Sequence, residues 1–327
     1  MCKAGRPFGQ LDRNAIKSMT LTIPPSLRMC RSRGIDAIAD TPNEIDGQTN
    51  FGASWHTLYG NRPIIIKGTY LSNASVVTIV GTILVFATFG LEIVECGGTL
   101  AKHVKSGGSV YAAVALSRPE AREQVIRAAK VLGVEVRFLD FKYGELQADV
   151  ESKKKLVRVI REVRPDIIIT QDPEPSLADL DPDRREAMIL YFEALSLASR
   201  DFAPEQFEEG LREHRFKSLY YLNPHHPNCV VDISDVFELK QRAVSELAYQ
   251  LAFTAKAIGE LMPKDRLASI IPEYSKYTSD LERGLELHRE MNKASGLFHG
   301  ILSHTRCALA EPFRREGMFT FDTLPLR

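Results

Sequence analysis

The sequence predicts an α/β fold, with a mostly parallel sheet covered by helices on both faces. From about residue 76, short runs rich in valine, isoleucine and alanine alternate with segments of helical periodicity. Such alternation is typical of parallel strands joined by right-handed crossover helices. In addition, the apolar run at 83–86 leads through a short irregular segment to Gly97 and Gly98, where a helical pattern begins. Strands feed helices in this way in folds of this class.

The first strand is expected over residues 76–87. The stretch 74–91 is nearly uncharged and close to the roughly 20 residues that cross a bilayer. However, it is rich in valine, isoleucine and threonine and is interrupted by Gly81 and Gly90. We therefore expect a buried strand here and no membrane anchor.

The later elements follow from apolar runs and from the residues that end helices. Gly133 and Pro165 each follow a helical pattern, and alanine and leucine form a stripe over 182–199. We expect helices at 98–105, 120–132, 150–163, 182–199 and 236–255, and strands at 109–116, 134–140, 166–170, 218–222 and 228–233.

Residues 1–75 differ from the rest of the chain. They contain proline, glycine, asparagine and serine in irregular order, without the sustained period of a strand or a helix. We interpret them as a disordered extension or as the result of a start site assigned too far upstream. Residues 76–327 are interpreted as one α/β domain.

The composition is that of a globular protein without a dominant charge. The 42 basic residues balance 42 acidic ones, so no net field attracts nucleic acid or an anionic membrane. The five cysteines are scattered and form no C-x-x-C pair, which favours a reducing compartment, the cytoplasm. We expect neither a nucleic-acid nor a membrane partner, and a homo-oligomer stays open.

Three segments follow the carboxyl ends of expected strands, where open parallel sheets bind ligands. They are 88–92, 117–120 and 171–186, of which the last is a long loop rich in aspartate. Capping of the next helix is the simpler role for that loop and is compatible with a place in a cleft. The candidate cleft residues are Thr88, Gly90, Leu91, Glu92, Asp172, Asp181, Asp183 and Arg184.

Seven short motifs occur in an order that resembles the LmbE/PIG-L family of zinc-dependent N-deacetylases. The family begins with A-H-P-D-D-E after a strand, followed by C-G-G-T-L, and the resemblance covers roughly residues 78–315. The matching positions are Ala87 with Glu92, 96–100 (CGGTL), 128–134 (AAKVLGV), 164–166 (RPD), 181–185 (DPDRR), 231–234 (VDIS) and 310–314 (AEPFR).

The resemblance implies a Rossmann-like domain that removes an acetyl group from a sugar of the N-acetylglucosamine type. In the family, three protein ligands hold zinc, which lowers the pKa of its bound water from about 15.7 to about 7. The ligand positions correspond here to Thr88, Leu91 and Arg184. The position of the general base corresponds to Gly90, and that of an assisting histidine to Asp181.

These substitutions remove the chemistry that the family requires. Leu91 has no lone pair, Arg184 is a fixed cation, and threonine is a poor zinc ligand beside imidazole or carboxylate. We therefore interpret the chain as a family member that has lost zinc-dependent deacetylation, uses no cofactor, and binds a small polar or sugar-like ligand or a partner protein. Arg184 is expected to be the main cationic contact of that ligand, since a guanidinium binds carboxylate or phosphate without a metal.

Two alternatives stay open. The first is an active N-acetyl-sugar deacetylase with a rebuilt zinc site, to which His225 and His226 would contribute together with acidic residues. Adjacent histidines on an extended chain point to opposite faces, which disfavours this set. The second is a sugar-phosphate or nucleotide site at 95–99 (ECGGT), where a helix N-terminus would hold a phosphate. Two glycines without the wider G-x-G-x-x-G spacing are a weak indication of such a site.

Overall fold

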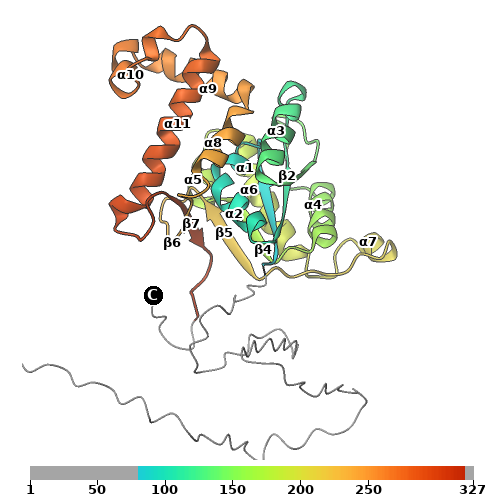
Figure 1. The fold of residues 1–327 in the computed structure, drawn as a ribbon. Coiled ribbons are helices and arrows are strands. Elements are labelled where there is room, and N and C mark those ends of the chain that lie inside the picture. Colours follow the sequence, from blue (N-terminus) through green and yellow to red (C-terminus); the bar gives the residue numbers. More distant parts are fainter. Residues whose placement is uncertain (1–79, 321–327) are drawn as a thin grey trace, which may run out of the picture. The chain divides into compact units, whose positions relative to one another are not determined.

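The computed structural model of the protein describes residues 80–320, which form a sheet of seven strands flanked by helices (Figure 1). The strand order is β3-β2-β1-β4-β5-β7-β6. The expected extension at 1–75 and the first residues of the expected strand 76–87 lie outside the described range. The strands are β1 (Thr82–Ala87), β2 (Ser109–Val114), β3 (Glu135–Phe138), β4 (Ile167–Gln171), β5 (Ser218–Leu222), β6 (Cys229–Asp232) and β7 (Ala310–Arg315).

The sheet is mostly parallel, which confirms the predicted fold class. β1 pairs in parallel with both β2 and β4, and β4 pairs in parallel with β5. The exception is β7, which is antiparallel to both β5 and β6. The sequence analysis assigned no strand there, because its residues, AEPFRR, include three charges and a proline and form no apolar run.

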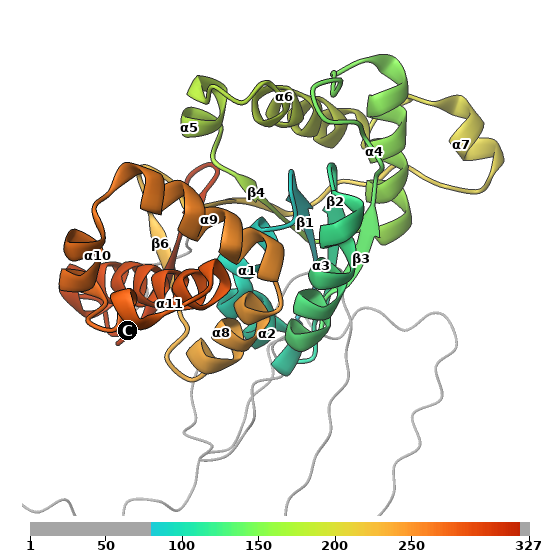
Figure 2. The same ribbon diagram turned by 90° about the horizontal axis from the view of Figure 1, so that it is seen from above.

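Helices cover both faces of the sheet in a three-layer arrangement, which Figure 2 shows from above. They are α1 (Glu92–Glu95), α2 (Gly97–Lys105), α3 (Pro119–Leu132), α4 (Val150–Val163), α5 (Pro173–Ala178), α6 (Pro182–Leu197), α7 (Pro204–Glu208), α8 (Phe237–Ser245), α9 (Ala248–Leu261), α10 (Lys264–Ile270) and α11 (Asp280–His299). Within residues 80–320, no helix is long and apolar enough to cross a membrane.

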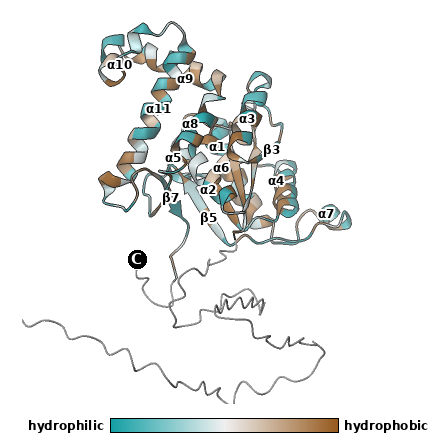
Figure 3. Ribbon diagram, viewed as in Figure 1, coloured by the Kyte–Doolittle hydropathy of each residue, from teal (hydrophilic) through white to brown (hydrophobic). Residues whose placement is uncertain are grey.

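The two cores follow from the alternation of side chains along the central strand. Ile83 and Val85 of β1 face the core under α2, α3 and α8, whereas Leu84 and Phe86 face the core under α4 and α6. A strand buried on both faces needs apolar residues at every position, so the run appears hydrophobic throughout in Figure 3. The nearly uncharged stretch is therefore a core strand over its described part.

One expected helix, 236–255, is two helices in the structure. The chain leaves helical geometry at Leu247, with φ −88° and ψ 52°, so that α9 departs from the sheet. α9 then packs against α11, at a distance so short that a Cβ on Gly284 would lie 2.2 Å from the carbonyl oxygen of Leu251. The hydrophobic periodicity of 236–255 does not indicate this break. The helices α10 and α11 are likewise not among the elements predicted from the sequence. The position of α11 matters because it forms the wall of a cavity.

A buried ion pair joins three elements beside the sheet. The carboxylate of Glu311 on β7 accepts hydrogen bonds from the backbone amides of Gly98 and Thr99 at 2.9 and 2.7 Å, which are in the first turn of α2. The ammonium of Lys240 on α8 lies 2.7 Å from the same carboxylate and also donates to the carbonyl of Glu95 at 2.6 Å. Both charged side chains are almost inaccessible to solvent, at 6% and 5%. This arrangement is called the Lys240–Glu311 pair below.

We expect Glu311→Ala to lower the free energy of unfolding by about 3–5 kcal/mol, because it leaves the Lys240 charge buried and unpaired. It also removes the acceptor of two amides. A matched control is Glu238→Ala, whose partner Arg289 forms an exposed pair and which should cost less than about 1 kcal/mol. Urea unfolding measures both values, and equal losses in the two variants would contradict a structural role for the Lys240–Glu311 pair.

Candidate functional site

A cavity of about 370 Å³ lies at the carboxyl ends of the central strands. The connections from β1 run toward β2 and β3 on one side, while β4 and β5 lie on the other. Such a topological switch point is where open α/β sheets bind ligands. We call this the strand-end cavity. Its lining residues are Phe89, Leu91, Glu92, Glu95, Arg118, Ala121, Tyr143, Asp181, Arg184, Tyr249, Gln250 and Phe253.

The three segments selected from the sequence meet in this cavity. Leu91 and Glu92 come from the first segment, Arg118 from the second, and Asp181 and Arg184 from the third. Of the eight candidate residues, these four from the first and third segments line the cavity. Thr88, Gly90, Asp172 and Asp183 do not line it.

The turn after β1 is held in shape by Glu92. Its buried carboxylate accepts hydrogen bonds from the backbone amides of Thr88, at 3.0 Å, and of Phe89, at 3.3 Å. Gly90 adopts φ +90°, a conformation that favours glycine. The side chain of Thr88 is fully buried, with its hydroxyl 3.5 Å from the hydroxyl of Tyr191 on α6. The Thr88 side chain thus belongs to the core and not to the cavity wall.

The aspartates of the third segment have mainly structural contacts. Asp172 is buried, and its carboxylate accepts from Arg314 at 2.7 Å and from the amide of His225 at 3.2 Å. Asp183 is also buried and accepts from the amide of Gly144 at 2.7 Å. The expected long loop at 171–186 is wrong, because the segment contains α5 and the first turn of α6, which Asp172 and Asp181 cap. Asp181 is the one of these three that reaches the strand-end cavity.

Arg184 belongs to a stack in which two aromatic rings are flanked by two guanidinium groups. Its guanidinium lies 5.3 Å from the ring centre of Phe89, which stacks on Tyr143 at 6.1 Å. The guanidinium of Arg118 lies 5.0 Å from the other ring, that of Tyr143. We call Arg184, Phe89, Tyr143 and Arg118 the arginine–aromatic stack, and all four line the strand-end cavity. Phe89, Arg118 and Tyr143 are not among the candidates predicted from the sequence, although the first two lie in the predicted cleft segments 88–92 and 117–120.

Arg184 also has polar contacts of its own. Its Nη1 donates to the amide oxygen of Gln171 at 3.3 Å, and its Nε lies 3.1 Å from a carboxylate oxygen of Asp179. The neighbouring Arg185 donates to the backbone carbonyl of Asp179 and does not line the cavity. Of these two arginines at the start of α6, Arg184 is therefore the one that lines the strand-end cavity.

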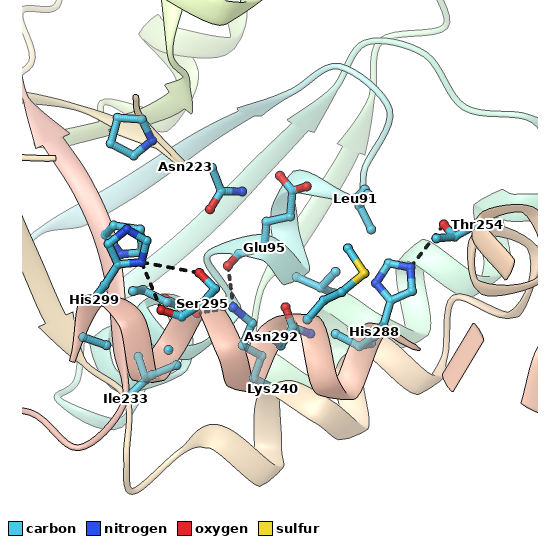
Figure 4. A pocket seen from close by; sticks show the side chains of 18 residues that line it. Leu91, Glu95, Asn223, Ile233, Lys240, Thr254, His288, Asn292, Ser295 and His299 are labelled. Atoms are coloured by element: carbon cyan, nitrogen blue, oxygen red, sulfur yellow. Dashed lines mark hydrogen bonds and ion pairs between the residues drawn. The ribbon is translucent and has the colours of Figure 1, made fainter. Parts of the chain in front are cut away.

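A second cavity of about 500 Å³ lies between α11, α8 and the edge of the sheet (Figure 4). We call it the α11 cavity. Leu91 and Glu95 line both cavities, so the two meet at α1. Its other lining residues are Val94, Asn223, Pro224, Ile233, Lys240, Val244, Thr254, His288, Met291, Asn292, Ser295, Gly296, His299, Ala310, Glu311 and Pro312.

Glu95 is the titratable group that stands out in this region. Burial and, to a smaller extent, the nearby Glu92 carboxylate raise its pKa from the ordinary 4.5 to about 7, against the lowering effects of Arg184, Lys240 and a hydrogen bond with Asn223. A carboxyl group with a pKa near 7 in a cleft is suited to proton transfer at neutral pH. Glu95 is not among the candidate residues predicted from the sequence. Its only signal was a charge at the end of an otherwise apolar stretch.

The residues at the family's zinc positions do not fit a zinc ion. The Thr88 hydroxyl is turned toward Tyr191, Leu91 offers no donor atom, and the Arg184 guanidinium is a fixed cation. The histidines considered for a rebuilt site line neither cavity, and His226 is 3.8 Å from Glu174 at the surface. Within the described part of the chain, no three His, Cys, Asp or Glu residues are grouped so as to hold a metal. We therefore derive no step through zinc.

Residues 95–99, at the start of α2, do not form the phosphate site that was considered for them. The amides of Gly98 and Thr99 already donate to the Glu311 carboxylate. A Cβ at Gly98 would lie 2.6 Å from the side chain of Ile233. The second glycine of this motif is thus explained by close packing, and the helix start is occupied by a carboxylate of the chain itself.

Comparison with known proteins connects this chain to sugar deacetylases. Residues 92–183 match the model of the PIG-L family, described as GlcNAc-PI de-N-acetylase. A diacetylchitobiose deacetylase of Thermococcus kodakarensis is 40% identical over 124 residues, which are 37% of this chain and 46% of that protein. The match therefore spans about half of the length of the relative.

Two solved structures share the fold. One is the 4-carboxy-2-hydroxymuconate hydratase GalB of Pseudomonas putida KT2440, with a TM-score of 0.55 and 21% identity over 75% of this chain and 99% of that one. The other is the N,N'-diacetylchitobiose deacetylase of Pyrococcus horikoshii, with a TM-score of 0.54 and 20% identity over 72% of this chain and 83% of that one. At these identities the likeness is one of fold, and a hydratase and a deacetylase share it.

The raised pKa of Glu95 predicts how stability depends on pH. The folded chain favours the protonated carboxyl, so this group's contribution is fully present below its unfolded pKa of 4.5 and is lost as the pH rises through about 7. Glu95→Gln keeps the neutral form at every pH. The variant should gain up to about 3 kcal/mol over the wild type between pH 4.5 and 8, less where solvent reaches the carboxyl. Urea unfolding of both proteins across this range measures the gain, and a constant difference would contradict the raised pKa.

Proposed function

We propose that this chain, which carries a PIG-L (LmbE) family domain, binds a sugar of the N-acetylglucosamine type in the strand-end cavity. The family match and the deacetylase relative support the class of ligand. The position of the cavity at the switch point of the sheet supports the site.

The observation that carries the proposal is the arginine–aromatic stack. Phe89 and Tyr143 are stacked on each other, and each has a guanidinium over its ring, so their cavity-lining edges would contact the less polar part of a sugar while a few polar groups fix its orientation. Arg118 and Arg184 place two guanidinium groups beside these rings. A guanidinium binds carboxylate or phosphate through paired hydrogen bonds. We therefore expect sugars that bear an acidic group to bind more tightly than neutral ones.

The residue chemistry favours binding without zinc-dependent hydrolysis. Leu91 and Arg184 stand where the family places ligands, and Gly90 stands where it places the base. A ligand anion would find a fixed cation, Arg184, where a zinc ion would otherwise lie. We retain the cytoplasm as the expected compartment.

Arg184→Ala should weaken binding of N-acetylglucosamine 6-phosphate by about 10- to 150-fold, the range for the loss of a hydrogen bond to a charged group. The adjacent Arg185→Ala removes the same charge from the same loop but from outside the cavity, so it should change affinity by less than about threefold. Calorimetric titration compares the three proteins. Equal losses of affinity in the two variants would indicate a general charge effect. No loss of affinity in Arg184→Ala would mean that Arg184 has only a structural role.

An N-acetyl-sugar deacetylase is the second candidate, and the comparisons support it better than they support a protein without activity. The relative that is 40% identical over 124 residues is named for this reaction. Glu95, with its pKa of about 7 and its place between the two cavities, would be the group able to accept a proton from an attacking water. This route assigns the general-base role to a residue that differs from the family position.

We expect the purified protein to contain no stoichiometric zinc and to release no acetate from N-acetylglucosamine or N,N'-diacetylchitobiose. The reason is the side chains at 88, 91 and 184, none of which suits zinc. Elemental analysis and an acetate assay, with and without added zinc, measure both outcomes. Acetate release that falls in Glu95→Gln would establish the deacetylase with Glu95 as its base. One tightly bound zinc per chain would instead identify a metal site outside the family positions.

A further inference from the structure

The α11 cavity contains an acidic group, the Glu95 carboxyl, with no matching cation in its wall. Lys240 is the lysine that lines it, but the Lys240 ammonium is engaged by Glu311 and by the Glu95 carbonyl and is almost fully buried. Glu311 is in turn neutralised by Lys240. Among the described residues, no lysine, arginine or histidine forms an ion pair with the Glu95 carboxylate, and its polar neighbour is the side-chain amide of Asn223.

The rest of the wall offers neutral hydrogen-bonding groups. Burial lowers the pKa of His288, which keeps its imidazole neutral at pH 7, and its Nε2 lies 3.2 Å from the Thr254 hydroxyl. Asn292, Ser295 and His299 point toward the cavity from successive turns of α11 in Figure 4. Amides, hydroxyls and imidazoles on one side and one carboxylate on the other suit a hydroxylated ligand with a single positive charge.

We propose that the α11 cavity is a binding site for a hydroxylated primary amine, such as an amino sugar, with Glu95 as the contact of its ammonium group. This site is distinct from the proposed N-acetyl-sugar site, since of the residues lining the strand-end cavity it shares only Leu91 and Glu95. It does not depend on the proposed function. Its volume of about 500 Å³ falls within the usual range for small-molecule sites, about 300–1,000 Å³.

The chemistry of the cavity argues against the other common ligand classes. A metal ion would need several ligands, and within residues 80–320 no three His, Cys, Asp or Glu residues are grouped for one. An anion would face the Glu95 carboxylate without a free cation. An ammonium group instead gains a charge-assisted hydrogen bond, and it stabilises the ionised carboxylate that burial disfavours.

Charged and titratable groups on every element around Glu95 affect this contact. Asn223 faces Glu95 from the loop between β5 and β6 in Figure 4. The charged and titratable groups are Glu92 on α1, Asp181 before α6, Arg184 on α6, Lys240 on α8, His288 and His299 on α11, Glu311 on β7 and Arg118 before α3. Arg184 lies on the side of the strand-end cavity and is already paired with Asp179. The α11 side is therefore where an added cation meets the least repulsion.

The test uses glucosamine and N-acetylglucosamine as probes, since they share one ring and differ in the charge at a single nitrogen. At pH 7, Glu95→Gln should weaken glucosamine binding about 10-fold or more, because it removes the anionic partner without a change in size. Ser295→Trp should also abolish that binding, because it fills the α11 cavity and alters no charge. Tyr143→Ala, in the strand-end cavity alone, should leave glucosamine affinity within about twofold. Calorimetric titration measures all four proteins.

Three outcomes would overturn the inference. The first is that glucosamine does not bind the wild type. The second is that it binds equally well to Ser295→Trp, and the third is that Tyr143→Ala abolishes its binding, which would place glucosamine in the strand-end cavity. Thermal unfolding shows whether each variant is folded. If Ser295→Trp does not fold, the comparison of Glu95→Gln with the wild type still tests the site. Loss of N-acetylglucosamine 6-phosphate binding in Arg184→Ala tests the other site independently.

Discussion

Glu311 accepts hydrogen bonds from the first turn of α2 and from the ammonium of Lys240, and both cavities depend on this contact. The Glu311 carboxylate brings the antiparallel strand β7 against the helix that follows β1. Lys240 then holds the end of α1 by its bond to the Glu95 carbonyl. Because these charges are buried, each one requires the other, so the three elements have a single stable arrangement. Glu95, at the end of α1, is thereby fixed where the cavities meet.

The turn after β1 keeps its shape without the residues that the family uses for chemistry. The Glu92 carboxylate still bonds the amides of Thr88 and Phe89, and Gly90 supplies the left-handed backbone. This network needs neither a metal nor an ionisable group at positions 88 and 91. The fold therefore tolerates threonine and leucine there, and the cavity beside the turn is bounded by rings and guanidinium groups instead.

The two cavities differ in charge although they share one helix. Arg118 and Arg184 border the strand-end cavity, whereas the ionisable group without a counterion in the α11 cavity is the Glu95 carboxyl. The helix α1, with Leu91 just before it and Glu95 at its end, lies where the cavities meet, and the carboxylates of Glu92, Glu95 and Asp181 also line the strand-end cavity. The pKa of Glu95 depends on groups in both cavities, because Arg184 and Lys240 lower it while burial raises it more. Ligands in the two cavities are thus expected to influence each other through this carboxyl.

The sequence by itself determined the parallel part of the fold and the place of the strand-end cavity. The short apolar run 167–169 after Pro165 is typical of a strand buried on both faces, and the ends of parallel strands meet at one edge of the sheet. The same reasoning brought 88–92, 117–120 and 171–186 together, and the structure has residues of all three in one cavity. The sequence does not separate Asp181, which reaches the cavity, from Asp172 and Asp183, because all three are aspartates within fifteen residues that contain the starts of α5 and α6.

Only the tertiary structure decided which groups are free and which are engaged. The apparent phosphate site at Gly98 and Thr99 is occupied by Glu311, which lies over two hundred residues away along the chain. The pairing of β7 and the break at Leu247 also depend on contacts between residues far apart in the sequence. Such contacts produce no periodic pattern in the local sequence. Glu95 has an unusual pKa because burial removes its water and Glu92 lies nearby. Burial and long-range charge pairing are properties of the packed chain, and no spacing along the sequence encodes them.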